Sequence, residues 1–316
     1  MYIRTVTGDV TCESIGHAQC HEHIYLLKGP SFACNPALCM DDYESSKREL
    51  LDYKRAGGSL IVDAQPGYFG RDAKVLRRLS EGSGVLIVAS TGFHKLSYME
   101  ENAPLLRMNE LRTADFFVDE IMRGMLDTDW ESARSRAGII KIVFEKDGLE
   151  NAVSRRLIRA AGAAASQTGA AIMIHTESDA DVSALLDYFS AMGMSMDRLL
   201  VCHLDRTHPD PDYHLRLLDR GCSLCYDSIH RYKYVSDAQE LALIRRVCTA
   251  GYEQQIVLSL DTTNQRLRAY YAKDMGLDYI LCSFIPQLRQ AGICEDHIRR
   301  MCRTNARRIL QLSINK

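Results

Sequence analysis

Two histidines separated by one residue, His21 and His23 in AQCHEHIYL, are the first side chains along the chain that could hold a metal ion. Successive side chains of a β-strand point to opposite faces, so both imidazoles would share one face while Cys20 and Glu22 take the other. Imidazole nitrogen is a common ligand of divalent transition metals. A lone strand histidine is more often a buried core residue, so the interpretation depends on finding further ligands.

Three further candidate ligands each stand at the end of an apolar run: His175 in IMIHTE, His203 in LLVCHLD and Asp261 in IVLSLD. Imidazoles combined with a carboxylate suit zinc, and also manganese, cobalt or iron. If these runs are parallel strands of one barrel, their ends meet at the C-terminal face, where the active sites of such barrels lie. The spacing therefore predicts a divalent-metal site there.

Lys141 lies inside the apolar run GIIKIVF, where an ammonium group is costly to bury. It could pair with a nearby acid such as Glu145 or Asp205. Alternatively, burial beside two metal cations lowers its pKa, and the neutral amine takes up carbon dioxide to form a carbamate that bridges both metals. The other five candidate ligands favour the carbamate.

The elements that must position these residues are eight short apolar runs, each followed by an amphipathic segment of helix length. Neither GxGxxG nor GxxxxGK[ST] follows any run, which argues against an open nucleotide-binding sheet. We therefore predict an α/β fold, a (β/α)8 TIM barrel that forms a single domain over residues 1–316. The expected strands are Ala18–Leu26, Ser59–Pro66, Val85–Gly92, Gly138–Phe144, Ala171–Glu177, Leu199–Asp205, Cys222–Ile229 and Gln255–Asp261. The expected helices are Ser45–Ala56, Ala73–Leu79, Leu111–Met125, Ala152–Ser166, Val182–Met192, Asp212–Asp219, Ala238–Ala250, Gln265–Asp274 and Glu295–Gln311.

Composition narrows the function classes. Lys and Arg total 39 against 41 Asp and Glu, a formal charge of −2, so a nucleic-acid partner is not expected. The sequence shows neither a signal-peptide pattern nor an apolar stretch long enough to span a membrane, so we expect a soluble, cytoplasmic protein. The 11 cysteines are scattered, several of them in apolar runs, and are interpreted as reduced.

The motifs resemble those of the phosphotriesterase family of the amidohydrolase superfamily, from end to end of the chain. The matching segments are GHAQCHEHI, LDTDWESARSRAGIIK, IMIHTE, VCHLDR and LSLDT. A terminal NARRIL stands where the family usually has Asn-Pro, a small departure that affects no candidate ligand.

The resemblance implies two divalent metal ions, with zinc expected and manganese or cobalt as alternatives. In the family pattern His21, His23 and Asp261 would hold the more buried ion, and His175 and His203 the more exposed one. The resemblance also suggests a homodimer.

The same resemblance implies that carboxylated Lys141 and a hydroxide bridge the two ions, and that this hydroxide attacks the substrate. Two cations lower the pKa of bound water and so create a nucleophile at neutral pH. Asp261, the implied catalytic residue, would accept the proton and pass it to the leaving group.

Within the family the loops look most like those of bacterial sugar-lactone hydrolases, on the segments GFHK, HLDRTHPDPDYH and YDSIHRYKY. Phosphosugar-lactone members use an arginine and a tyrosine shortly after the last-strand aspartate, where this chain has Asn264 and Leu267. Arg266, Arg268 or Tyr270 could substitute after a shift. The candidate substrate-binding residues are Lys95, Arg206, Lys233, His94 and His230, with Arg231 also near the mouth.

We therefore predict a hydrolase that opens a small, polar, sugar-derived lactone, with or without a phosphate group. The alternatives are an N-acyl amide hydrolase or a phosphotriesterase-type ester hydrolase that uses the same site. A non-catalytic binding protein is disfavoured because all six candidate ligands are present.

Overall fold

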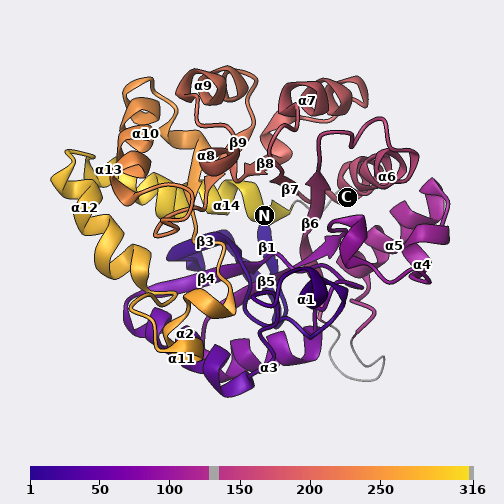
Figure 1. Ribbon diagram of the computed structural model, residues 1–316, viewed down its shortest axis with the longest axis horizontal. Coiled ribbons are helices and arrows are strands. Elements are labelled where there is room, and N and C mark those ends of the chain that lie inside the picture. Colours follow the sequence, from indigo (N-terminus) through magenta and orange to yellow (C-terminus); the bar gives the residue numbers. More distant parts are fainter. Residues whose placement is uncertain (128–134, 313–316) are drawn as a thin grey trace.

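Eight parallel strands follow one another in sequence order around a nearly closed barrel, in a computed structural model that describes residues 1–127 and 135–312 (Figure 1). Each strand overlaps one that the sequence predicts, so the expected (β/α)8 fold is confirmed. Part of the segment LDTDWESARSRAGIIK, residues 128–134, lies outside the described residues. The barrel strands are β3 His17–Glu22, β4 Gly58–Asp63, β5 Leu86–Gly92, β6 Ala137–Phe144, β7 Ile172–Thr176, β8 Leu199–Cys202, β9 Ser223–Tyr226 and β10 Ile256–Leu258.

The seam between β3 and β10 is closed by individual hydrogen bonds that join the ends of these two strands. The backbone N–H of Asp261 donates to the His21 carbonyl at 3.2 Å, and the His21 N–H donates to Ser259 Oγ at 2.8 Å. The Glu22 side chain accepts from the Leu260 N–H at 2.7 Å. The seam therefore runs directly through the residues that carry the HxH motif and Asp261.

Alternation along the strands produces two separate apolar cores. On β4, Leu60 and Val62 pack inside the barrel, whereas Ile61 packs outward against the helices. At the N-terminal end of the strands, the barrel interior is filled by Ile3 and by Leu310 from the terminal helix. This packing leaves the opposite, C-terminal end free for polar side chains.

A ring of helices surrounds the strands (Figure 1), and most begin at an Asp, Asn or Ser whose side chain accepts backbone N–H groups of the first turn. The long helices are α2 Tyr43–Arg55, α3 Ala73–Ser83, α5 Glu110–Met122, α6 Ala152–Thr168, α7 Val182–Ala191, α9 Pro211–Asp219 and α10 Asp237–Thr249. Short helices are η1 Cys12–Ser14, α1 Pro30–Cys34, η2 Leu96–Tyr98, α4 Pro104–Arg107, η3 Met196–Arg198, α8 Leu204–Thr207 and η4 Glu253–Gln255.

The chain after β10 differs from the sequence prediction. The helix expected over Gln265–Asp274 is wrong: the structure has only η5 Asn264–Arg266 and α11 Arg268–Tyr271, because Ala272 takes a left-handed φ of 50° that ends the turn. A helical segment that was not predicted follows, η6 Ile280–Phe284 and α12 Ile285–Gln290. The terminal helical segment is α13 Glu295–Arg299, η7 Arg300–Thr304 and α14 Asn305–Leu310.

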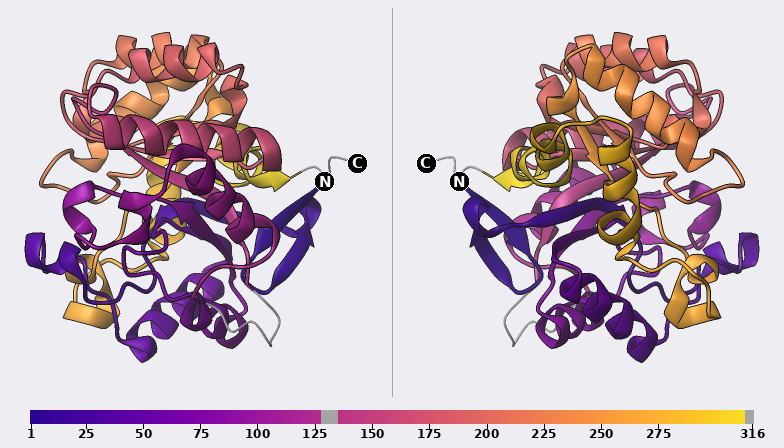
Figure 2. Two further views of the ribbon diagram at one scale, coloured as in Figure 1. Left: turned by 90° about the vertical axis from the view of Figure 1, so that its right-hand side faces the viewer. Right: turned by 90° about the vertical axis from the view of Figure 1, so that its left-hand side faces the viewer.

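A small antiparallel sheet, also not predicted, brings the two ends of the chain together (Figure 2). Its strands are β1 Tyr2–Thr5, β2 Gly8–Thr11 and β11 Gln311–Leu312. Among the described residues no helix is long and apolar enough to cross a membrane.

Candidate metal centre

Five of the barrel strands bring the predicted ligands to the C-terminal end of the barrel. His21 is the last residue but one of β3, Lys141 lies on β6 and His175 on β7, while His203 and Asp261 follow β8 and β10. Apart from His175, which is partly exposed, each of these side chains is buried. His23 is also buried, one residue beyond β3.

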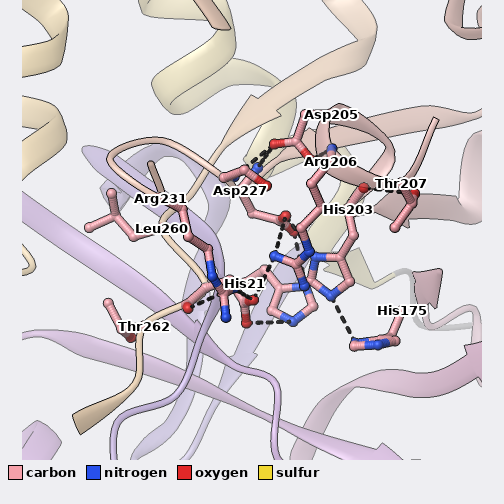
Figure 3. Close-up of polar contacts among 12 residues, drawn as sticks. His21, His175, His203, Asp205, Arg206, Thr207, Asp227, Arg231, Leu260 and Thr262 are labelled. Atoms are coloured by element: carbon pink, nitrogen blue, oxygen red, sulfur yellow. Dashed lines mark hydrogen bonds and ion pairs between the residues drawn. The ribbon is translucent and has the colours of Figure 1, made fainter. Parts of the chain in front are cut away.

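The nitrogen and oxygen atoms of these side chains form two groups, within each of which they lie within 4.8 Å of one another. In the first, Asp261 Oδ1 lies 3.7 Å from His21 Nε2 and 3.5 Å from His23 Nε2. In the second, His203 Nε2 lies 2.8 Å from His175 Nδ1, and His21 is again a member (Figure 3). The first group holds the three residues assigned to the more buried ion, and the second holds the two residues assigned to the more exposed ion together with His21.

Lys141 lies beside the shared histidine, with its Nζ 3.1 Å from His21 Nε2. Burial lowers the pKa of its amine, whereas the nearby carboxylates of Asp261 and Asp227 act in the opposite direction. Within the described ranges Lys141 forms no ion pair with Glu145 or Asp205, the two acids that the sequence suggested as partners.

The histidines are in the form that binds a metal. Burial lowers the pKa of His21, His175 and His203 well below the ordinary value, so that each imidazole is neutral and has a lone pair to donate. The donors fit a divalent cation, since neutral imidazoles and a carboxylate converge on one another in a buried place.

The backbone is strained at two of these positions. His203 and Asp261 have positive φ values of 71° and 49°, in the left-handed region that residues with a Cβ rarely adopt. Such conformations cost of order 1 kcal/mol or more and persist only where the surroundings impose them, often at functional sites. His203 directly follows β8, and Asp261 lies three residues beyond the end of β10, so both strained residues lie at the C-terminal end of the barrel.

Asp227 is a site residue that the sequence interpretation missed. It follows β9, is fully buried and accepts a hydrogen bond from His203 Nδ1 at 2.7 Å (Figure 3). Its other oxygen lies 3.4 Å from His21 Nδ1. Asp205 in turn accepts from the backbone N–H of Asp227 at 2.8 Å. The sequence offered one signal for it, since Asp227 is an acidic residue at the end of the apolar run of the seventh barrel strand.

Glu177 was also missed, and it connects a candidate ligand to a candidate substrate residue. His175 Nε2 donates to Glu177 Oε1 at 2.6 Å, and Lys95 Nζ lies 2.6 Å from the same oxygen. The predicted substrate residue Lys95 is thus tied to the carboxylate that orients His175.

Two arginines cap the outer oxygen of Asp261. Arg206 Nη1 donates to Asp261 Oδ2 at 2.8 Å, and Arg231 Nη1 contacts the same oxygen. Burial alone would raise the pKa of Asp261, but the guanidinium groups of Arg231 and Arg206 hold it well below the usual range. Oδ1 remains directed toward His21 and His23.

A cavity of about 260 Å³ lies over the centre, and the predicted substrate residues divide between it and a neighbouring groove. His94, Lys95 and Arg206 line the cavity. His230 and Lys233 line the adjoining groove of about 330 Å³, which shares Arg231 and Tyr234 with the cavity.

The residues that could replace the family's arginine and tyrosine all have partners within the protein, and Arg266 also lines the adjoining groove. The guanidinium of Arg266 donates to backbone carbonyls of Leu260, Asp261 and Ile229 and so holds the loops together. Arg268 donates to Asp278 at 3.2 Å, and Tyr270 Oη lies 2.6 Å from Ser46 Oγ.

Comparison with known proteins agrees with this geometry. A sequence profile of the phosphotriesterase family matches residues 1–310. Phospho-furanose lactonase of Mycoplasmopsis agalactiae is 28% identical over 325 residues, covering 98% of this chain and 91% of that protein. N-acetyltaurine hydrolase of Tetraodon nigroviridis is 26% identical over 291 residues, covering 88% of this chain and 80% of that protein. The solved structure of an amidohydrolase from Mycoplasma synoviae has a TM-score of 0.92 at 26% identity, and the match covers 100% of this chain and 93% of that one.

Proposed function

The chain belongs to the phosphotriesterase family of hydrolytic enzymes, and from that premise we propose a binuclear-metal lactonase acting on a small, polar, sugar-derived lactone that carries an anionic group. The observation that carries this proposal is the convergence of the candidate ligands beneath a cavity lined by Lys95, Arg206 and Arg231. The family supplies the reaction class, and the cationic lining supplies the charge expected of the substrate.

We assign the ligands as two sets that meet at one bridge. Zinc suits these donors, and manganese or cobalt suit them as well. Bound there, two divalent ions would lower the pKa of a water molecule so that it attacks at neutral pH, and would polarise the substrate carbonyl. The more buried ion is assigned to His21, His23 and Asp261, the more exposed ion to His175 and His203, and the bridge to carboxylated Lys141.

The cationic side chains of the cavity would bind and orient the substrate. An anionic group that enters it competes with Asp261 for Arg206 and Arg231, whose planar guanidinium groups can form forked bonds to phosphate or carboxylate. We assign to Asp261 the proton that the attacking water loses and the leaving group takes up.

His94 has a fixed tautomer that suits it for donating a hydrogen bond. Its Nδ1 accepts the backbone N–H of Lys95 at 2.7 Å, so a neutral ring carries its proton on Nε2. Because His94 lines the cavity, we assign this N–H to a substrate oxygen. Lys233 and His230, in the adjoining groove, would contact the part of the substrate farthest from the scissile bond.

A second candidate is hydrolysis of an N-acyl amide whose amine part carries an anionic group. The similarity to N-acetyltaurine hydrolase favours it, since the acyl taurine in that protein's name is such an amide. The same cationic lining would accept its sulfonate. Phosphotriesterase-type ester cleavage would be a side reaction of the same centre.

The test is to purify the protein without chelator, measure bound metal, and assay matched substrates. Sugar lactones with and without a phosphate group are followed by proton release, and N-acetyltaurine by release of the amine. Two metals per chain with preferred turnover of the phosphorylated lactone supports the proposal. Turnover of the amide alone selects the second candidate, and protein that stays metal-free with zinc and bicarbonate supplied overturns both.

The sequence-based expectations of a cytoplasmic homodimer with no nucleic-acid partner stay proposals. Light scattering on the purified protein tests the dimer, and fractionation of cells tests the location.

A further inference from the structure

Glu22 stands between the two histidines of the HxH motif but points away from them, across the barrel seam. It is fully buried. Its Oε1 accepts the backbone N–H of Leu260 at 2.7 Å, and its Oε2 accepts the N–H of Thr262 at 3.1 Å and the Thr262 hydroxyl at 2.9 Å. These two residues, labelled in Figure 3, stand on either side of Asp261 in the sequence, on the segment that follows β10.

This carboxylate helps to fix the backbone on both sides of Asp261. The N–H of Asp261 itself donates to the His21 carbonyl at 3.2 Å, so three successive N–H groups are held by β3. The φ of 49° at Asp261 is disfavoured for a residue with a Cβ and needs such restraint. Glu22 belongs to the same strand as His21, so it ties the position of the aspartate to that of the histidines.

We propose that Glu22 is a positioning residue that places Asp261 Oδ1 against His21 and His23, and thereby sets the affinity of the more buried metal site. The inference rests on the proposed function, because it requires that these three residues bind a metal. Groups that orient metal ligands from behind typically change metal affinity by about 10–100-fold when they are removed.

The experiment compares Glu22→Gln and Glu22→Asp with the wild type in zinc content and in zinc affinity measured by chelator competition. In Glu22→Gln the amide nitrogen faces a backbone N–H, so one donor loses its acceptor. We expect zinc to fall from two per chain to about one, with about 10–100-fold weaker binding at the lost site. Glu22→Asp keeps the carboxyl group but is one methylene shorter. We expect it to lose zinc too, whereas full loading would show that the reach of the side chain to Leu260 and Thr262 does not matter and would overturn the proposal.

Glu49 provides a matched control elsewhere in the fold. It is buried and accepts the backbone N–H groups of Ala269 at 2.6 Å and Leu277 at 3.1 Å. Glu49→Gln loses the same kind of contact, so we expect a lower Tm with two zinc ions retained. If Glu49→Gln loses zinc as Glu22→Gln does, general destabilisation explains the effect and the proposal fails.

Thr262 supplies a second test that changes no charge. Thr262→Val removes the hydroxyl that donates to Glu22 and that also lies 3.3 Å from the His23 backbone N and 3.1 Å from the His23 carbonyl, and Thr262→Ser restores it. We expect weaker zinc binding in the first variant and recovery in the second, and unchanged zinc binding in Thr262→Val would contradict the proposal even if Glu22→Gln does not fold. A wild type without zinc refutes the proposed function, whereas a wild type with two ions and unchanged variants refutes only the role of Glu22.

Discussion

Asp227→Asn should weaken the binding of one metal by an amount that the hydrogen bond to His203 sets. Asp227 Oδ1 lies 2.7 Å from His203 Nδ1, whereas the 3.4 Å between Asp227 Oδ2 and His21 Nδ1 is long for a strong bond. A hydrogen bond to a charged group contributes about 1.5–3 kcal/mol and a neutral one about 0.5–1.5 kcal/mol. Asn keeps a neutral acceptor, so the difference is about 1–1.5 kcal/mol, or about 5–15-fold in affinity at the site of His203.

Asp227→Ala removes the acceptor entirely and should weaken that site by about 10–100-fold. The assay is zinc competition with a chromogenic chelator, resolved into the two sites. Affinities in the order wild type, Asn variant, Ala variant support the reasoning. Equal affinities in all three would refute the claim that Asp227 orients His203.

In the metal-free protein, Asp227→Asn should make the stability less sensitive to a rise in pH. Burial raises the pKa of Asp227 above its unfolded value of 3.8, so the folded state holds its proton to higher pH than the unfolded chain does. The stability that protonated Asp227 contributes is therefore fully present below its unfolded pKa and is lost as the pH rises through its folded pKa. The range from about pH 4 to about pH 8 spans the ordinary and the raised pKa of this group. Over that range the Tm of metal-free Asp227→Asn should fall less than the Tm of the metal-free wild type. A steeper loss in the variant would contradict the argument.

Three further predictions concern other parts of the molecule. Lys141→Ala should bind zinc at least about tenfold weaker and lose turnover, with partial recovery in acetate, because acetate can stand in for the bridging carbamate; unchanged zinc content would contradict this. Arg206→Met and Arg231→Met should each raise KM for a phosphorylated lactone by about 10–100-fold, the equivalent of a charge-assisted bond, and leave KM for a neutral lactone nearly unchanged. Because both arginines also contact Asp261, kcat is expected to change for both substrates alike. Equal changes in KM for both substrates would count against an anion site. Arg71→Met should lower the unfolding free energy by about 3–5 kcal/mol, measured by denaturant titration, without changing the zinc content. The reason is that the buried Glu120, which accepts hydrogen bonds from Arg71 at 2.6 and 2.9 Å, loses its charged partner.

The barrel could be predicted from the sequence because each strand is a short apolar run and each long helix starts at a capping residue, and both are local signals. The sheet of β1, β2 and β11 could not, since it pairs Tyr2 with Leu312 and no local pattern reports such a distant partner. The helix expected over Gln265–Asp274 failed for the same reason. Its amphipathic pattern was real, but Glu49 binds the N–H of Ala269 and Arg266 binds carbonyls of two loops, and these tertiary contacts determine the backbone there.

The candidate site shows the same division between local and distant information. The ligands were visible because a polar residue at the end of an apolar strand stands out in the sequence. Glu22, Asp227 and Glu177 were not assigned a role, because what each does depends on a partner brought near by the fold. A carboxylate next to a histidine in the sequence is uninformative until the direction in which it points is known.

The supporting carboxylates also make the metal-free state costly, which links metal binding to folding. Glu22 and Asp227 are fully buried, and burial raises the pKa of Glu22 to about 8. An acid with a raised pKa destabilises the fold at neutral pH unless a positive charge lies near it. Divalent ions at the proposed sites would supply that charge while taking up the lone pairs of the neutral histidines. Part of the metal-binding free energy would then be free energy of folding, since binding relieves a cost that these acids impose on the empty barrel.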